Sequence, residues 1–203
     1  MSRMNIVLAS GSPRRSDLLE KLGWNIRVTV PEVDESPLSS ESPENLCTRL
    51  SAAKAARVAE MEPYNKEEGV LVVAADTIVV IDGDVLGKPA GEDESLLMLK
   101  RLQGRTHEVL TGVSVMTKQK TLSGLERTRV TFRALDDKAI RAYAATGEGV
   151  DKAGAYAIQG KGSLLVSSIE GDYFNVVGLP LCRLSLMIEE LGLNLPLQWG
   201  VKM

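Results

Sequence analysis

The most apolar stretch of the chain predicts a strand that is buried on both faces. Residues 70–75 are all aliphatic, a pattern typical of strands covered on both sides in an α/β sheet. Asp76 interrupts the run, and a second aliphatic run follows at 78–81. The dipeptide Asp82-Gly83 then favours a tight hairpin turn. We therefore expect this hairpin to return Lys88 towards Asp76, which would suit a metal and an anionic substrate.

Apolar periodicity elsewhere predicts alternating strands and helices, as in other α/β proteins. Strands are predicted at residues 5–9, 24–30, 108–116, 127–132 and 163–169. Helices are predicted from Pro13 to Gly23, from Ser42 onward, and at 93–103, 136–146 and 181–191. A loop through Ser123-Gly124 is expected to join the strands at 108–116 and 127–132.

The segment after the first predicted strand combines features of an anion-binding site. Ser10-Gly11-Ser12 forms a turn, Pro13 suits the first helical position, and Arg14 and Arg15 follow in the first turn. The free N–H groups of a helix start attract anions, whereas arginines there oppose the helix dipole. We favour anion binding over a solvated helix start. It is not a Walker loop, because the spacing to a Gly-Lys-Ser/Thr sequence is absent.

Two later segments carry further candidate groups. Glu32, Asp34 and Glu35 place three carboxylates within four residues, although most such acidic loops are solvated. Lys54 lies beside the apolar stripe of the helix that starts at Ser42. Residues 151–162 are rich in small side chains, so this backbone can approach a ligand closely.

Composition excludes several classes of protein. A chain of 203 residues, 44% hydrophobic and 25% charged, can bury a full core as one large domain or two fused lobes. No stretch approaches the roughly 20 apolar residues of a membrane span, and a signal peptide is lacking, so we expect a cytoplasmic protein. The net charge of -3 argues against binding a nucleic acid polymer. One histidine excludes a histidine-rich metal site, and Cys47 and Cys182 are expected to be buried free thiols.

Several separated motifs resemble, in the same order, those of the Maf nucleoside triphosphate pyrophosphatases. They are Ala9-Ser10-Gly11-Ser12-Pro13-Arg14-Arg15, Ala75-Asp76-Thr77, Gly87-Lys88-Pro89, Asp151-Lys152-Ala153-Gly154 and Gly178-Leu179-Pro180. The resemblance implies a cytoplasmic, metal-dependent enzyme, often a homodimer, that converts a nucleoside triphosphate to the monophosphate and pyrophosphate. It also implies one domain over 1–203, with a mixed twisted sheet, flanking helices and two lobes around a cleft, similar to the inosine triphosphate pyrophosphatases.

The resemblance extends to individual positions. Asp76 corresponds to the family's catalytic proton acceptor, and Arg14, Thr77 and Gln159 fall at its base-discriminating positions. Arg14 with Gln159 resembles the branch that acts on dTTP and UTP, whereas the branch acting on 7-methyl-GTP carries tryptophan and glutamate there. Gly149-Val150 departs from the usual pattern, in which a proline follows the preceding glutamate.

The chemistry of the substrate agrees with these positions. A triphosphate carries about four negative charges, so its site needs cations, N–H donors and a metal. Carboxylate oxygens of Glu35 and Asp76 suit Mg²⁺ or Mn²⁺, and Asp76 is also placed to deprotonate water. The predicted catalytic residues are Glu35, Lys54, Asp76 and Lys88. The predicted substrate-binding residues are Ser10, Arg14, Arg15, Thr77 and Gln159.

Other interpretations stay open at this point. Asp76 could cap a turn, with Lys88 a solvated surface charge, and Gln159 could merely stabilise its own loop. The alternative functions are a 7-methyl-GTP pyrophosphatase, a nucleotide-binding regulator of septum formation without turnover, and a phosphate-binding domain whose charges are structural.

Overall fold

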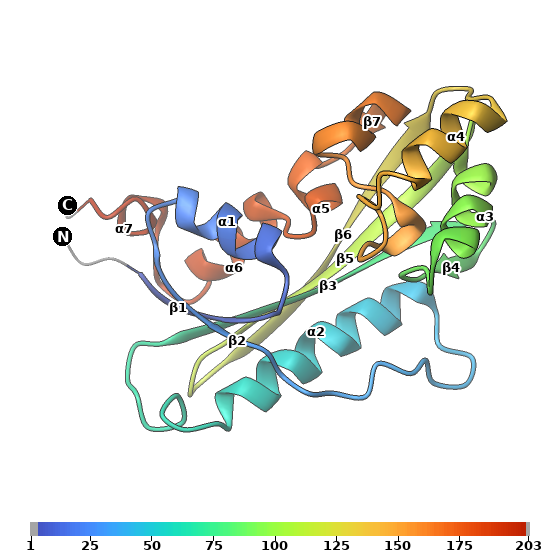
Figure 1. The fold of residues 1–203 in the computed structure, drawn as a ribbon. Helices are drawn as coiled ribbons and strands as arrows, with labels where there is room; N and C mark the ends of the chain where they lie inside the picture. Colours follow the sequence, from blue (N-terminus) through green and yellow to red (C-terminus); the bar gives the residue numbers. More distant parts are fainter. Residues whose placement is uncertain (1–3, 202–203) are drawn as a thin grey trace. The chain divides into compact units, whose positions relative to one another are not determined.

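The protein has a mixed α/β fold, seen in a computed structural model that describes residues 4–201. Its seven-stranded sheet has the order β2-β1-β3-β5-β6-β7, with β4 paired to β3 (Figure 1). The strands are β1 (Asn5–Ala9), β2 (Asn25–Thr29), β3 (Leu71–Ile81), β4 (Asp84–Leu86), β5 (Thr106–Met116), β6 (Thr121–Phe132) and β7 (Val166–Glu170). The helices are α1 (Pro13–Lys21), α2 (Pro43–Ala59), α3 (Glu92–Leu102), α4 (Asp137–Ala144), α5 (Tyr173–Val177), α6 (Leu181–Glu189) and α7 (Leu195–Gln198).

Both pairing directions occur in the sheet. β1 pairs in parallel with β2 and β3, whereas β3–β4 and β6–β7 are antiparallel. This confirms the predicted α/β class with a mixed sheet and flanking helices. Within residues 4–201, every helix is too short or too polar to cross a bilayer.

The chain divides into two compact units. The first unit contains the residues up to Asp76, Thr111–Glu126 and the residues from Gly178 onward, and the second contains Thr77–Leu110 and Arg127–Val177. β3, β5 and β6 each run from one unit into the other, and β3 divides between Asp76 and Thr77. Two lobes were predicted, and two units are found. The cleft and the organisation as one domain stay predictions.

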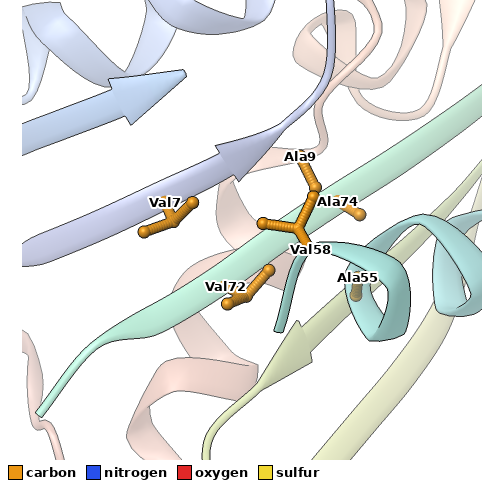
Figure 2. Close-up of a cluster of buried hydrophobic side chains, with 6 residues drawn as sticks. All are labelled: Val7, Ala9, Ala55, Val58, Val72 and Ala74. Carbon is orange, nitrogen blue, oxygen red and sulfur yellow. The ribbon is translucent and has the colours of Figure 1, made fainter. Parts of the chain in front are cut away.

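In the first unit, α2 is fastened to the strands by small apolar side chains. β1 and β3 alternate their side chains between the two faces, and both faces are buried. One face of these strands contacts α2 in a cluster of Val7, Ala9, Ala55, Val58, Val72 and Ala74 (Figure 2). Because Ala55 is buried in this cluster, the preceding Lys54 is held close to the same strands.

Two further contacts hold α2 in the first unit. A Cβ atom on Gly112 of β5 would lie 2.2 Å from the carbonyl oxygen of Cys47, so only glycine allows this close approach. The hydroxyl of Ser51 is 2.9 Å from that of Ser114, which is 2.8 Å from that of Ser123. The helix that carries Lys54 is therefore fixed by polar as well as apolar contacts.

The second unit begins with the predicted hairpin. β3 turns into β4 through Asp82 and Gly83, with φ values of 55° and 83°. Its core includes three rings in edge-to-face contact, those of His107, Phe132 and Tyr156. The second unit thus has an aromatic core, where the cluster on α2 in the first unit is aliphatic.

The predicted loop through Ser123-Gly124 is wrong. The turn between β5 and β6 lies at 117–120, where the Thr117 hydroxyl accepts hydrogen bonds from the N–H groups of Gln119 and Lys120. Gly124 lies inside β6, and a Cβ there would be 3.2 Å from Cδ of Arg183. This glycine reflects close packing against α6 rather than a turn.

The C-terminal third contains other differences. Residues 163–165, predicted as the start of a strand, belong to the 3-10 helix η2 (Gly160–Leu165), and β7 begins only at Val166. The short helices α5 and α7 were not predicted. Cys47 is buried as predicted, but Cys182 is exposed, because α6 buries the face of Leu184 and Ile188 instead.

Candidate active site

Three predicted residues of the first unit meet in one charged cluster. Lys54 Nζ lies 2.6 Å from Glu35 Oε1 and 2.6 Å from Asp76 Oδ1. The two carboxylate oxygens are therefore no farther apart than twice that distance. The side chains of Lys54 and Asp76 are only 12% and 11% exposed, whereas that of Glu35 is 58% exposed. A buried carboxylate needs such a partner, so Lys54 balances the charge of Asp76.

The acidic loop that carries Glu35 is ordered by its own hydrogen bonds. Arg49 of α2 binds both carboxylate oxygens of Glu41, at 2.6 and 2.8 Å, and donates to the carbonyl of Ser36 at 3.0 Å. The hydrogen bond from Arg49 lowers the pKa of Glu41 to about 2. Asp34 accepts a hydrogen bond from the N–H of Ser36. The loop is thus tied to α2, the helix that also carries Lys54.

Ser10 and Arg15 form a second group in the first unit. Arg15 Nη1 donates to Ser10 Oγ at 2.9 Å, and Arg15 Nε donates to the carbonyl of Gly178 at 2.7 Å. Burial lowers the pKa of Arg15 to about 10, although the charge of Asp76 acts in the opposite direction. Arg15 is therefore still a cation at neutral pH. These bonds connect the first and last of the sequence motifs.

The helix start beside this pair has the predicted form. Ser12 is the N-cap of α1, Pro13 is the first helical residue, and no acidic residue lies in the first turn. The Ser12 side chain makes no capping hydrogen bond, and its N–H donates to Ser10 Oγ at 3.2 Å. Arg14 is half-buried in the same turn. The turn thus combines a helix N-terminus with two cations, the combination expected for an anion site.

The remaining predicted residues lie in the second unit. Thr77 follows Asp76 in β3 and is half-buried, and Lys88 is exposed just after β4. The carbonyl of Gly87, beside Lys88, accepts a hydrogen bond from the N–H of Gly154 at 3.1 Å. Two more sequence motifs are thereby joined. An approach of Lys88 to Asp76 stays a prediction.

Gln159 caps the 3-10 helix η2 in the second unit and is half-buried. The residues that hold its loop, Tyr143 and Glu148, were not among the predicted site residues, and neither were Arg49 and Glu41. All four act through hydrogen bonds to a loop, which apolar periodicity does not report. The glycines beside Glu148 were the one local signal.

The carboxylates fit a divalent cation only in part. Glu35 and Asp76 supply carboxylate oxygens, the donor type that Mg²⁺ and Mn²⁺ prefer, but in this structure both carboxylates are paired with the Lys54 ammonium. Within the described residues 4–201, no three His, Cys, Asp or Glu side chains are grouped as a metal site. Any further ligands would therefore come from the substrate and from water.

Comparison with known proteins shows which family the chain belongs to. The family profile described as Maf-like protein matches residues 5–191. A protein from Symbiobacterium thermophilum named dTTP/UTP pyrophosphatase is 49% identical over 92% of this chain and 94% of its own length. Relatives of the same name from Pelotomaculum thermopropionicum and Bacillus cereus (strain B4264) are 49% and 46% identical, each over 93% of this chain and 97% and 96% of their own.

A solved structure, that of the Staphylococcus aureus Ham1 protein, aligns with 63% of this chain and 71% of its own at a TM-score of 0.43 and 14% identity. This likeness is too low to extend the fold assignment, so the predicted similarity to the inosine triphosphate pyrophosphatases rests on the sequence motifs. The family assignment rests on the profile match and on relatives nearly half identical along almost the whole chain. On these grounds, the chain belongs to the Maf family.

Proposed function

We propose that this protein hydrolyses dTTP and UTP to the nucleoside monophosphate and pyrophosphate. The observation that carries the proposal is the cluster of Glu35, Lys54 and Asp76, which gathers acidic oxygens and a cation at one point. The relatives of 46–49% identity named dTTP/UTP pyrophosphatase support the choice of substrate over 7-methyl-GTP. We also propose a cytoplasmic location and a homodimer.

The triphosphate would be bound by positive groups. Arg15 is oriented through Ser10 and Gly178, and the planar fork of its guanidinium matches the geometry of phosphate oxygens. Arg14 and Lys88 would add point contacts to the phosphates, as would the N–H groups at the start of α1. Since the net charge of the chain is -3, these cations would act as a local cluster rather than through a basic surface.

Glu35 and Asp76 would hold the divalent cation. Mg²⁺ is commonly bound by one or two carboxylates together with substrate phosphates and water. Two protein carboxylates are therefore enough, provided that the triphosphate completes the coordination. When bound, the cation would supply charge neutralisation at the phosphates.

Asp76 would accept the proton of the attacking water. The water oxygen forms a bond to a phosphorus of the α–β anhydride, and the anhydride P–O bond breaks. The monophosphate and pyrophosphate then leave, and the proton is passed from Asp76 to solvent. Lys54, already paired with Asp76, would keep this carboxylate oriented and would approach the developing charge on the phosphate.

Gln159 would select the base. The edge of uracil or thymine offers an N3–H between two carbonyl oxygens. A carboxamide can accept a hydrogen bond from this N3–H while it donates one to a carbonyl oxygen of the base. Cytosine reverses part of that pattern. A mismatch would leave a polar group without a partner, which costs about 1 to 3 kcal/mol.

The proposal is tested by incubating the purified protein with dTTP, UTP, CTP, purine triphosphates and 7-methyl-GTP, with Mg²⁺, with Mn²⁺ or with a chelator. We expect pyrophosphate, not phosphate, to be released fastest from dTTP and UTP, and only with a metal. Faster turnover of 7-methyl-GTP than of dTTP and UTP would refute the assignment to the dTTP/UTP branch. Nucleotide binding without turnover would favour a nucleotide-binding regulator.

A matched pair of lysine variants links the activity to the cluster. Lys54→Met removes the cation between the two carboxylates and should abolish most pyrophosphate release. Lys100→Met removes an exposed lysine that pairs with the exposed Asp137 at 3.0 Å, and should leave turnover unchanged. Equal activity in the two variants would contradict the role of the cluster.

A further inference from the structure

The loop that carries Gln159 is pinned on both sides by two residues with no role assigned so far. The hydroxyl of Tyr143, on α4, accepts a hydrogen bond from the N–H of Ala157 at 3.1 Å. The carboxylate of Glu148 accepts from the N–H groups of Lys161 at 2.9 Å and Gly162 at 2.8 Å. The loop is therefore gripped two residues before Gln159 and again two and three residues after it.

The two pinning residues are also bound to each other. The Tyr143 hydroxyl donates to Glu148 Oε2 at 3.0 Å, so one hydrogen-bonded chain connects both ends of the loop. Tyr143 is buried, with 7% of its surface exposed. A hydroxyl that both accepts and donates in a buried position has its direction set by its partners. The contact is thus a hydrogen-bonded clamp that is buried at Tyr143 and partly exposed at Glu148.

The glycines of the loop show how closely it fits against the clamp. A Cβ on Gly160 would lie 2.3 Å from Glu148 Oε1, and one on Gly162 would lie 2.7 Å from the Tyr143 hydroxyl. Neither position could carry a side chain without moving a clamp residue. On the N-terminal side of the loop, the Tyr156 hydroxyl lies 2.9 Å from His107 Nε2 in the aromatic core. The loop is therefore held by contacts both before and after Gln159.

We infer that Tyr143 and Glu148 are positioning residues for base selection, fixing the carboxamide of Gln159 against the pyrimidine edge. The inference rests on the proposed function, since it assigns the residues behind the base-contact loop. A carboxamide that must donate and accept at once tolerates little displacement of its backbone. The clamp acts on that backbone, through the N–H groups of Ala157, Lys161 and Gly162.

The electrostatic environment of Glu148 agrees with a clamp that is charged under working conditions. Burial alone would raise the pKa of Glu148, but the N–H groups of Lys161 and Gly162 and the Tyr143 hydroxyl outweigh it, and the pKa is lowered. At neutral pH the carboxylate is ionised and has acceptor oxygens for all of these bonds. The amide of a Glu148→Gln variant has only one acceptor oxygen and would release one of the loop's N–H groups.

The test compares kcat/KM for UTP and CTP in the wild type, Tyr143→Phe and Glu148→Gln. We expect each variant to lower the ratio of UTP to CTP by roughly tenfold, because a misplaced contact group loses its directional bonds. The loss should appear mainly in KM for UTP, with kcat at saturation little changed. A clamp that served stability alone would slow both nucleotides equally, and an unchanged ratio would overturn the inference.

Tyr64→Phe is the matched control. Its hydroxyl is also hydrogen-bonded, to Thr29 at 2.8 Å, but Tyr64 belongs to the first unit. This variant should lose a comparable hydrogen bond but keep the wild-type ratio of kcat/KM for UTP to that for CTP. If Tyr64→Phe lowered the ratio as much as Tyr143→Phe, the effect would not be specific to the loop and the inference would fail.

Amide hydrogen exchange on the wild type keeps the inference testable if a variant does not fold. The N–H groups of Ala157, Lys161 and Gly162 should exchange slowly, and free exchange at all three would overturn the clamp. Failure of the proposed function is distinguishable, because a wild type that releases no pyrophosphate from any nucleotide refutes the activity in the same assay, whatever the exchange rates.

Discussion

The two units present their candidate site residues in different ways. In the first unit, Glu35, Lys54 and Asp76 hold one another directly through their charges. In the second unit, the loop of Gln159 is held through its backbone, at residues 157, 161 and 162. Loss of a charged partner leaves an uncompensated buried charge, whereas a change at Gln159 alters only what the loop presents. The difference predicts that the charged cluster of the first unit governs rate and that the loop of Gln159 in the second unit governs selectivity.

The largest effect is expected at Asp76. Asp76→Asn keeps the volume of the side chain but removes both the charge and the base, so kcat should fall by about 10²-fold or more. The ratio of UTP to CTP should not change. Steady-state pyrophosphate release checks both, with Asp137→Asn as the control, since Asp137 also pairs with a lysine but is exposed. A near-wild-type kcat would remove Asp76 from the catalytic role.

The second effect concerns stability. The aromatic core of the second unit and the ion pairs of the first unit should contribute differently to the pH dependence of the free energy of unfolding. Burial lowers the pKa of His107 to about 4, and within residues 4–201 its Nδ1 atom has no hydrogen-bond partner for an added proton. The unfolded chain, with a histidine pKa near 6.5, binds a proton at higher pH than the folded one does. The free energy of unfolding should therefore fall by about 3 kcal/mol as the pH drops from about 6.5 to 4.

Denaturant unfolding across this pH range measures the effect, with His107→Gln as the comparison because glutamine does not titrate. Between pH 6.5 and 4, the free energy of unfolding should fall less in His107→Gln than in the wild type, and the difference should equal the contribution of His107 given above. The Arg49–Glu41 pair of the first unit should still contribute at pH 4.5, since the pKa of Glu41 is about 2, and its contribution should disappear only as the pH falls from about 4.5 towards 2. Equal pH curves for wild type and His107→Gln would contradict the prediction.

The third effect is on base preference. Gln159→Glu removes the N–H donor that would face a pyrimidine carbonyl, so discrimination between UTP and CTP should weaken by about 1 to 3 kcal/mol. The reaction itself should continue. Gln119→Glu, on the exposed turn between β5 and β6, is the matched control for the added charge. Unchanged discrimination would favour the alternative in which Gln159 only stabilises its loop.

The smallest effect tests whether rate and selectivity divide between the units at all. Lys88 lies in the second unit but is proposed to meet phosphate, so Lys88→Ala should lower kcat/KM for UTP and CTP alike, by roughly tenfold. The loss should shrink at high salt, because an exposed charge is screened. Lys138→Ala, at another exposed lysine, is the control. A selective loss with one base would contradict the phosphate role.

Much of the local fold could be predicted because it depends on neighbouring residues. The strand through residues 70–75, the Asp82-Gly83 hairpin and the Ser12-Pro13 helix start all follow from short-range sequence rules. The mistaken turn at Gly124 shows where those rules fail. A glycine in close contact with Arg183 of α6 has the same sequence signature as a turn glycine.

The candidate site could be predicted where its chemistry is carried by the side chains themselves. The predicted Glu35, Lys54 and Asp76 do meet, because a buried carboxylate requires a cation. The clamp of Tyr143 and Glu148 was not predicted, since its partners are backbone N–H groups up to 14 residues away and its one local sign in the sequence was the glycines beside Glu148. The pairing of Arg49 with Glu41 escaped prediction because it crosses the start of α2.

The clamp around Gln159 has an evolutionary consequence. Because the backbone of the loop is bonded at positions 157, 161 and 162, we expect its conformation to tolerate different side chains at 159. A single codon change there can alter what the enzyme recognises without the compensating mutations that a reshaped loop would demand. At Gly160 and Gly162, by contrast, a Cβ atom would clash with neighbouring atoms, so we expect substitutions there to be selected against. Natural diversification and laboratory evolution of substrate range should therefore concentrate on one exchangeable residue in an otherwise invariant frame.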